Sequence, residues 1–283
     1  TVAGDFTTSG GLIGKSALTF AGGTDSNVTG VVACGSDSSI DNIWDSGGTV
    51  EAWINVTEAG QDNGDGGIIA SKVYWYVSTT NDNSTKCKLC LRHYWTGDDP
   101  LWKSTDDVIT YGKWHHVAVT YDSGDAANVP TFYVDGKQVE VENTGLTPTT
   151  ARNTDASQSL YLGNYDADDN MHFDGTIGMV RLFTDVRTVT ELRTDMFRPF
   201  ASMSSTHLLA AMYQFDEGTG TSVDDVSANS NVGTFTAGSS EADWAAAGTF
   251  TKGTSTLTLT GSSKNLTFTG NEGVHNLTVN GTY

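Results

Sequence analysis

The clearest alternation of hydrophobic and polar positions in this chain runs from Trp114 to Tyr121. In an extended strand, successive side chains point to opposite faces of the sheet. The residues that share the first face are Val117, Val119 and Tyr121, and those that share the second face are His116, Ala118 and Thr120. This pattern predicts a β-strand with one face packed against a hydrophobic core.

A β-hairpin is predicted directly after this strand. Residues Thr131–Val134 form a second alternating run, which ends at Asp135 and Gly136. An Asp-Gly pair tolerates the positive φ angles of a two-residue turn, so the chain is expected to return over Lys137–Glu142. The cross-strand pairs that this register places on the apolar face are Phe132 with Val139 and Pro130 with Val141.

Further strands are predicted on both sides of the hairpin. They span Lys15–Val28, Thr49–Val56, Ile68–Ser78, Lys86–Trp95, Ser159–Tyr165 and Asp174–Thr184. A short helix is expected over Thr188–Arg198, where Leu192 and Met196 have helical spacing and Pro199 stops the helix. The chain has 32 Gly and 4 Pro, a composition that suits many short strands joined by tight turns. The expected fold class is therefore all-β.

Several strands carry short motifs in a characteristic order. The motifs are Ala17–Phe20, Thr49–Ile54, Gly67–Lys72, Trp114–Asp122, Phe132–Lys137, Leu160–Asn164 and Phe173–Ile177. In this order they resemble the successive strands of laminin-G-like, concanavalin-type jelly-roll domains. The resemblance covers roughly the first two thirds of the chain, and an ordered set of motifs is more specific than any one of them. It implies an antiparallel two-sheet sandwich, with a short C-terminal helix, that is used mostly for recognition.

Three regions are expected along the chain. The jelly-roll sandwich is predicted to span residues 1–199. Residues 200–247 are expected to be a linker, in which Leu208–Gly233 resembles the opening of a second such module. Residues 248–283 contain β repeats, each of which alternates apolar and polar residues before a glycine. The repeats are Leu257–Gly261, Leu266–Gly270 and Leu277–Gly281. Their open edge predicts pairing with neighbouring copies of the chain.

The net charge of the chain limits the classes of partner that it is expected to bind. Lys and Arg number 15 against 34 Asp and Glu, so the formal net charge is −19. Such a surface repels polyanions, and nucleic acid is therefore not an expected partner. No apolar run has the length of a membrane span, so membrane insertion is not expected.

Glycosylation sequons such as Asn55-Val56-Thr57 favour an extracellular location, at a cell surface or a virion surface. The first residues, Thr1–Gly4, contain neither a starting Met nor a signal core, and we interpret them as the start of a processed segment.

The three cysteines cannot all pair with one another. Cys87 and Cys90 lie three positions apart on a predicted strand, so their side chains point to opposite faces. This placement disfavours a redox or zinc motif, which normally needs a helix start or a tight knuckle. Packed thiols are the preferred interpretation, and a disulfide from Cys34 to one of the other two is the alternative.

No catalytic group is predicted, and we expect that the protein is not an enzyme. The Glu-x-Asp-x-x-Glu motif of jelly-roll glucanases is absent. Glu140 and Glu142 share a strand face about 7 Å apart, which is within the range of glycosidase carboxylates. They follow a hairpin tip, however, and are interpreted as solvated. His115 and His116 are adjacent, so they point to opposite faces and cannot form one site.

Calcium is the expected cofactor, with solvated turn carboxylates as the alternative interpretation. Calcium takes six to eight oxygen ligands, which loops rich in Asp and Asn supply. The resemblance implies a site at the rim of the sandwich, near the first strand and the Phe-Asp-Gly strand. The candidate ligands are Asp25, Asp166, Asp168 and Asp174.

Aromatic side chains that could stack on sugar rings are the candidate ligand-binding residues. They are Trp75, Tyr94, Trp95, Trp102 and Tyr165. For Trp75 and Trp95, a position in the core is the alternative.

The expected function is a non-catalytic extracellular recognition or adhesion module that binds surface glycans or proteins. A structural subunit of a virion, fibre or surface filament is the alternative, and a glycoside hydrolase is a weaker one.

Overall fold

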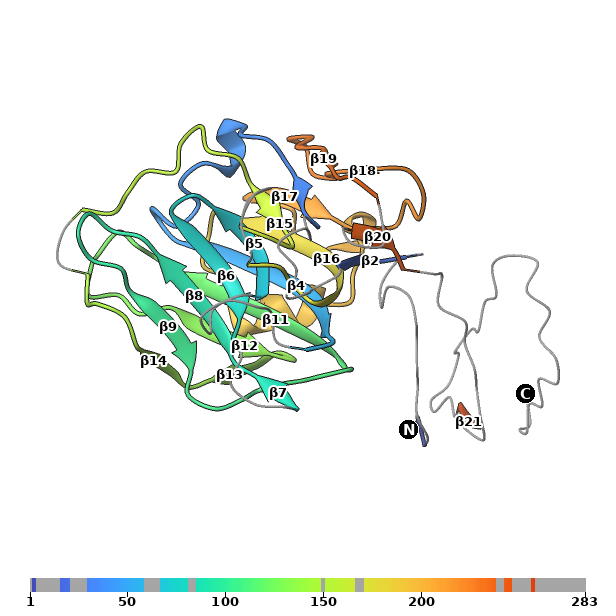
Figure 1. The fold of residues 1–283 in the computed structure, drawn as a ribbon, viewed down its shortest axis with the longest axis horizontal. Coiled ribbons are helices and arrows are strands. Elements are labelled where there is room, and N and C mark those ends of the chain that lie inside the picture. Colours follow the sequence, from blue (N-terminus) through green and yellow to red (C-terminus); the bar gives the residue numbers. More distant parts are fainter. Residues whose placement is uncertain are drawn as a thin grey trace. The chain divides into compact units, whose positions relative to one another are not determined.

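The computed structural model describes residues 16–20, 30–58, 67–80, 85–148, 151–165, 171–237 and 242–245. It also gives the backbone of two short strands, β1 (Val2–Ala3) and β21 (Thr256–Leu257), which pair antiparallel. These two strands belong to a unit formed by residues 1–7 and 250–283. The remaining strands belong to a second unit, residues 8–249 (Figure 1).

Two antiparallel sheets make up the second unit. Sheet 1 has the spatial order β13 (Lys137–Val139), β12 (Thr131–Val134), β11 (Trp114–Tyr121), β4 (Gly48–Val56), β16 (Gly175–Phe183), β2 (Leu18–Phe20) and β20 (Ala242–Trp244), and β17 (Leu209–Tyr213) also pairs with β16. Sheet 2 has the order β14 (Val141–Asn143), β9 (Leu101–Ser104), β8 (Leu89–His93), β6 (Trp75–Thr79), β5 (Gly67–Lys72), β15 (Tyr161–Leu162), β3 (Val32–Ala33), β19 (Gly233–Thr234) and β18 (Ser222–Val223).

A separate pair is formed by β7 (Lys86–Cys87) and β10 (Ile109–Thr110). The helical segments are η1 (Ser38–Ile40), α1 (Val189–Asp195) and η2 (Phe200–Ser202). The predicted all-β, antiparallel jelly-roll architecture with one short helix is therefore confirmed.

The predicted hairpin forms in the predicted register. Phe132 pairs with Val139, and both turn residues, Asp135 and Gly136, have positive φ angles of 51° and 68°. The return strand is shorter than expected, however. The chain leaves sheet 1 at Glu140, and the following residues form β14 at the edge of sheet 2. The expected pairing of Pro130 with Val141 is therefore wrong, because Val141 pairs with Ser104 of β9 instead.

The hydrophobic core lies between the inner faces of the two sheets. Sheet 1 contributes residues such as Val50, Val119 and Phe132, and sheet 2 contributes residues such as Trp75 and Leu91. The outer face of β11 is also buried, which the alternation did not indicate. Ala118 on that face packs against Leu192 of α1. The helix therefore covers a second face of the strand that the sequence predicted to have one dry face.

The helix begins at Thr188 with a capping box. The backbone N–H of Glu191 donates to the Thr188 hydroxyl at 3.3 Å, and the Glu191 carboxylate accepts the Thr188 N–H at 2.8 Å. These bonds satisfy backbone donors that the first turn of a helix leaves without partners. The helix ends at Asp195, before the Arg198 that the sequence suggested.

A buried charged network joins α1 to the outer face of sheet 1. Arg181 of β16 and Glu51 of β4 lie 2.5 Å apart, and both are almost fully buried. Arg181 also donates to the carbonyl oxygen of Asp195 at 2.9 Å, and His116 lies 3.4 Å from the second oxygen of Glu51. Burial by itself would raise the pKa of Glu51, but the Arg181 charge and the His116 contact outweigh it and lower this pKa to about 2.

The segment after Pro199 is part of the sandwich, so the expected domain boundary is wrong. Strand β17 pairs with β16, β20 pairs with β2, and the hairpin of β18 and β19 pairs with β3. Tyr213 and Phe215 of this segment are fully buried in the main core. The described residues 200–237 and 242–245 therefore complete both sheets instead of forming a linker. The β repeats expected over residues 248–283 lie outside the described residues, apart from the backbone of β21.

The cysteines are Cys34, Cys87 and Cys90, and all of them are buried without a disulfide. This confirms the interpretation of packed thiols. Burial raises the pKa of the Cys34 thiol to about 12, so it is not a reactive thiolate. Within the described ranges, no helix has both the length and the hydrophobicity that a membrane crossing requires.

Candidate ligand-binding pocket

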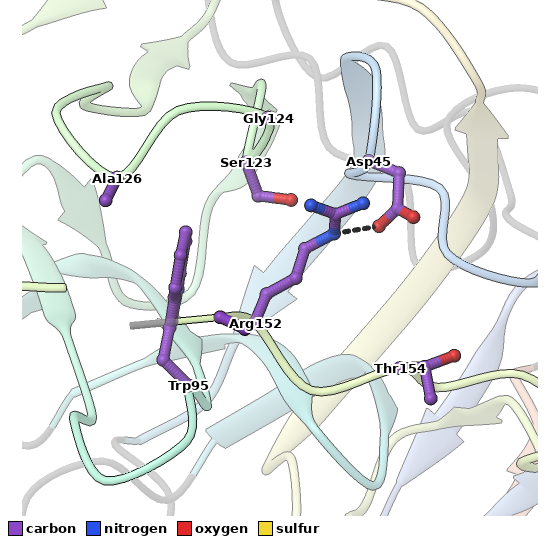
Figure 2. A pocket seen from close by; sticks show the side chains of 8 residues that line it. Asp45, Trp95, Ser123, Gly124, Ala126, Arg152 and Thr154 are labelled. Carbon is purple, nitrogen blue, oxygen red and sulfur yellow. Dashed lines mark hydrogen bonds and ion pairs between the residues drawn. The ribbon is translucent and has the colours of Figure 1, made fainter. Parts of the chain in front are cut away.

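A pocket opens at the end of the sandwich where β4 begins and β11 ends. Its volume is about 440 Å³. Its lining residues are Asp45, Trp95, Ser123, Gly124, Ala126, Ala151, Arg152 and Thr154 (Figure 2). They come from the turn before β4, the turn between β8 and β9, the loop after β11 and the connection that leads to β15. The volume falls within the range of about 300 to 1,000 Å³ that is common for small-ligand sites.

An ion pair crosses this pocket. The Nε atom of Arg152 donates to a carboxylate oxygen of Asp45 at 2.5 Å, and each side chain is about one third exposed. This hydrogen bond, and the negative charges of Asp45 and Asp122, raise the pKa of the Arg152 guanidinium. This bond uses Nε, and a guanidinium carries two further amino groups that can donate to a ligand.

Trp95 forms the wall beside Arg152 (Figure 2). The two residues are joined by an isolated antiparallel β-bridge, and the backbone N–H of Thr96 donates to the Ala151 carbonyl oxygen at 2.9 Å. The turn that carries Trp95 and the connection that carries Arg152 are thereby held side by side. Trp95 is only 4% exposed, so it presents a limited apolar surface to the pocket.

Aromatic rings continue from Trp95 into the core. The His93 ring lies 5.9 Å from the Trp95 ring and 5.9 Å from the Tyr121 ring. Tyr121 in turn lies 5.0 Å from Trp102. Burial lowers the pKa of His93 to about 3 and raises that of the Tyr121 phenol, so both side chains are neutral near pH 7. The aromatic side chains that continue from Trp95 into the core are therefore uncharged.

A second buried network anchors the connection that carries Arg152. Lys72 of β5 is fully buried, and its Nζ atom lies 2.9 Å from Asp41 and 3.0 Å from Asp155. Asp155 also accepts a hydrogen bond of 2.7 Å from the indole N–H of Trp75. Asp155 is three positions after Arg152, so these bonds fasten the pocket wall to sheet 2. Such supporting contacts preorganise the geometry of a binding site before the ligand binds.

The structure separates the aromatic residues that the sequence suggested as one ligand site. Trp75 and Trp102 are 0% and 2% exposed and lie in the core. The prediction that their rings stack on a ligand is therefore wrong. Trp95 reaches the pocket. Tyr94 and Tyr165 lie elsewhere, on the outer face of sheet 2, and do not line the pocket.

The outer face of sheet 2 carries a tyrosine cluster. The rings of Tyr94 and Tyr165 lie 6.3 and 5.9 Å from the ring of Tyr76 on β6. The guanidinium of Arg92 lies 5.7 Å from the Tyr94 ring centroid, a cation–π contact. The Tyr165 hydroxyl donates to the carbonyl oxygen of Val73. These contacts hold the rings against one another.

The candidate calcium ligand that the structure describes is Asp174, at the start of β16. Asp25, Asp166 and Asp168 lie outside the described residues. Burial, together with the negative charge and hydrogen bond of Glu58, raises the pKa of Asp174 to about 6. In the described part of the chain, no cluster of three or more His, Cys, Asp or Glu side chains could hold a metal ion. Asp174 and Glu58 lie at the end of the sandwich opposite the pocket, because β4 starts at the pocket and ends beside them.

The side chains considered as catalytic groups have structural contacts. Glu140 and Glu142 are exposed, and Glu142 lies 3.5 Å from Lys88. His115 lies 2.9 Å from Asp135 of the hairpin turn and accepts the backbone N–H of Thr110 at 3.1 Å. The two histidines point apart, as expected, since His116 contacts Glu51 on the other side. Neither glutamate nor either histidine lines the pocket.

Sequence reasoning missed both charged residues of the pocket. Asp45 lies in a polar loop and Arg152 in a long polar connection, and 107 positions separate them along the chain. Neither residue belongs to a motif or to an alternating run. A weak signal was available, since Arg152 is one of only 15 basic residues in a strongly acidic chain.

A family model described as the concanavalin A-like lectin/glucanases superfamily, Laminin_G_3, matches residues 23–193. The chain belongs to this superfamily. The match includes every residue that lines the pocket and ends within α1, so the superfamily model does not extend to β17–β20. No curated protein matches the chain.

Solved structures resemble this chain at low identity, and one of those named here has a TM-score above 0.5. A proposed carbohydrate-binding protein from Bacteroides ovatus has a TM-score of 0.54 and 19% identity, and the match covers 79% of this chain and 58% of that one. The CBM40 of Ruminococcus gnavus IT-sialidase bound to α2,3 sialyllactose has a TM-score of 0.41 and 13% identity, with 65% and 97% covered. Tailspike protein 2 of an Escherichia coli O157:H7 bacteriophage has a TM-score of 0.41 and 12% identity, with 72% and 30% covered. This chain thus spans little more than half of the Bacteroides protein, and the similarities show the fold alone.

Proposed function

We propose that this chain is a non-catalytic carbohydrate-binding module whose ligand occupies the pocket of Asp45, Trp95 and Arg152. The observation that supports the proposal is the arrangement of a charged hydrogen-bonding pair beside an aromatic wall in one preformed pocket. Membership of a superfamily that contains lectins adds to this support.

The chemistry of the pocket suits sugar hydroxyl groups. A hydroxyl both donates and accepts hydrogen bonds, so neighbouring hydroxyls can accept from Arg152 and donate to Asp45 at the same time. Hydrogen bonds to charged groups are stronger than those between neutral groups. The apolar surface of Trp95 can contact the C–H face of a sugar ring. Among the described lining residues, Asp45 carries the carboxylate, and that carboxylate is already bonded to Arg152, whereas hydrolysis of a glycoside needs two carboxyl groups that flank the bond.

Binding to immobilised glycans tests this proposal. The wild-type protein is expected to retain at least one class of glycan, and Arg152→Ala is expected to lose it. Lys137→Ala is a matched control, because Lys137 is an exposed basic residue on the hairpin, away from the pocket lining. Equal binding by all three proteins would place the ligand elsewhere, and the tyrosine cluster would then be the next site to test through Tyr94→Ala.

Calcium binding beside Asp174 is a second part of the proposal. Asp174 and Glu58 are two carboxylates that repel one another, which is one reason why the Asp174 pKa is high. A divalent cation between them would remove this repulsion, and carboxylate oxygens suit calcium. These two side chains supply only part of the oxygen ligands that calcium requires. The carboxylate pair is therefore the part of the proposed calcium site that the structure describes. The ion would order the end of the sandwich opposite the pocket.

Thermal unfolding with and without calcium tests the ion. Excess Ca²⁺ is expected to raise the melting temperature of the wild-type protein relative to a chelator, since a ligand that binds only the folded state stabilises it. Asp174→Asn should abolish the increase, and Asp224→Asn, an exposed carboxylate, should keep it. An equal increase in both variants would remove Asp174 as a ligand.

The extracellular location at a cell or virion surface, the protein partners and the pairing of neighbouring copies through residues 248–283 stay predictions. Assembly of the purified chain into ordered oligomers would favour the alternative role of a structural subunit.

A further inference from the structure

The positive charge of Arg152 is already balanced within the protein. Asp45 is bonded to its guanidinium at 2.5 Å, and Asp122 is close enough to raise its pKa as well. The other titratable groups that face this end of the pocket, His93 and Tyr121, are neutral near pH 7. One carboxylate is therefore bonded to the guanidinium and a second acts on it electrostatically, on a chain whose formal net charge is −19.

Hydrogen bonds hold Asp122 and the connection that carries Arg152 in place. Asp122 accepts the backbone N–H of Gly124 at 2.8 Å, and the amide of Asn128 donates to the Asp122 carbonyl oxygen at 3.0 Å. Arg152 is held by its β-bridge to Trp95 and through the anchored connection that follows it. The ion pair of Arg152 and Asp45 is therefore held in place, and an incoming ligand meets the Asp45 carboxylate directly beside the guanidinium.

We propose that this pocket selects neutral saccharides through adjacent hydroxyl groups and rejects saccharides that place a carboxylate or sulfate at the bound ring. The inference rests on the proposed function of the pocket. An anionic group that bonds to Arg152 would displace the Asp45 carboxylate or lie beside it, within the negative field of Asp122. Like charges in contact are unfavourable, and such repulsion is a common source of specificity. A neutral ring avoids this cost, because its hydroxyls can bond to both members of the ion pair without separating them.

Removing the carboxylate of Asp45 should change the preference of the pocket. In Asp45→Asn the guanidinium of Arg152 no longer has its bonded counterion, although the amide oxygen can still accept a hydrogen bond from Nε. A carboxylated sugar could then form the two-point bond with Arg152 that guanidinium groups favour. Neutral sugars would lose a charge-assisted hydrogen bond at the same position. The two ligand classes are therefore expected to respond in opposite directions.

Matched pairs of immobilised oligosaccharides provide the test. Each pair consists of a neutral oligosaccharide and the same oligosaccharide ending in a uronic or sialic acid. We expect the wild-type protein to bind the neutral member at least about tenfold more tightly, with little effect of NaCl, because no net ligand charge is involved. Asp45→Asn should reduce or reverse this ratio. Asp122→Asn, which leaves the Asp45 bond intact, should change the ratio in the same direction and serves as the second variant if Asp45→Asn does not fold.

The outcomes separate this inference from the proposed function. Wild-type binding that favours the acidic member, weakens in NaCl and is lost in Arg152→Ala would overturn the inference while keeping the pocket as the glycan site. Absence of binding to every oligosaccharide, or binding that survives Arg152→Ala, would overturn both. A preference for the neutral member that stays the same in Asp45→Asn and Asp122→Asn would also overturn the inference, since the carboxylates would not be its source.

Discussion

The buried network of Glu51, Arg181 and His116 makes the stability of this protein depend on one carboxylate. Glu51→Gln keeps the shape of the side chain and removes its charge. The variant leaves the guanidinium of Arg181, which is 1% exposed, with two backbone carbonyl oxygens from Asp195 and Arg198 and without its counterion. A buried charge that loses its partner typically destabilises a protein by about 3 to 5 kcal/mol.

The low pKa of Glu51 leads independently to a similar magnitude. It falls from 4.5 to about 2 on folding. The difference of about 2.5 units, at about 1.36 kcal/mol per unit, corresponds to roughly 3 kcal/mol. Because the folded pKa is lower than the unfolded pKa, this stability is present above pH 4.5 and is lost as the pH falls toward 2. Both arguments give about 3 kcal/mol for the ionised Glu51 side chain near pH 7.

Urea unfolding followed by circular dichroism checks this prediction. At pH 7 the free energy of unfolding of Glu51→Gln should be about 3 kcal/mol below that of the wild type, and the difference should shrink as the pH approaches 2. Glu142→Gln is the control, because Glu142 is exposed and lies 3.5 Å from Lys88. A surface pair of this kind contributes at most about 1 kcal/mol. A loss in Glu51→Gln no larger than in this control, at every pH, would refute the argument that the carboxylate balances the buried guanidinium.

Other parts of the structure give three further predictions. Tyr213→Ala should lower the free energy of unfolding in urea by about 3 to 5 kcal/mol, because it opens a cavity in the core beside β16. An effect below about 1 kcal/mol would contradict the role of Tyr213 in the core. Thr188→Ala should cost about 1 kcal/mol through the lost helix cap, and Thr188→Ser should restore most of it. In a chelator, the protonated form of Asp174 should contribute stability fully below pH 3.8 and lose it as the pH rises through about 6. Asp174 is partly exposed, so the loss should be only about 1 kcal/mol, and melting curves of Asp174→Asn should show no such decline.

Local features of the sequence determined much of the sheet structure. The alternation from Trp114 to Tyr121 specified a strand, and Asp135-Gly136 specified a turn with two positive φ angles. These two features were sufficient to pair Phe132 with Val139. The reason is physical, since strand faces and tight turns depend on residues that are neighbours in the chain. The short helix was predictable in the same way, from the spacing of Leu192 and Met196.

The limits of local reasoning appear where burial depends on distant parts of the chain. Alternation could not distinguish Trp102, which the other sheet covers, from a tryptophan that faces solvent. It gave β11 one dry face, but α1 buries the second. Leu208–Gly233 resembles the start of a new module in sequence, and only the pairings of β17 with β16 and of β19 with β3 show that this segment completes the same sandwich.

The candidate site was decided by tertiary structure alone. Asp45 and Arg152 are ordinary loop residues in the sequence, and 107 positions separate them. They meet because β4 begins and β11 ends at the same end of the sandwich, and because the ion pair of Lys72 with Asp155 anchors the connection that carries Arg152. Hydrophobic patterns specify which faces are buried, whereas the charge and shape of a pocket depend on which loops the complete fold brings together.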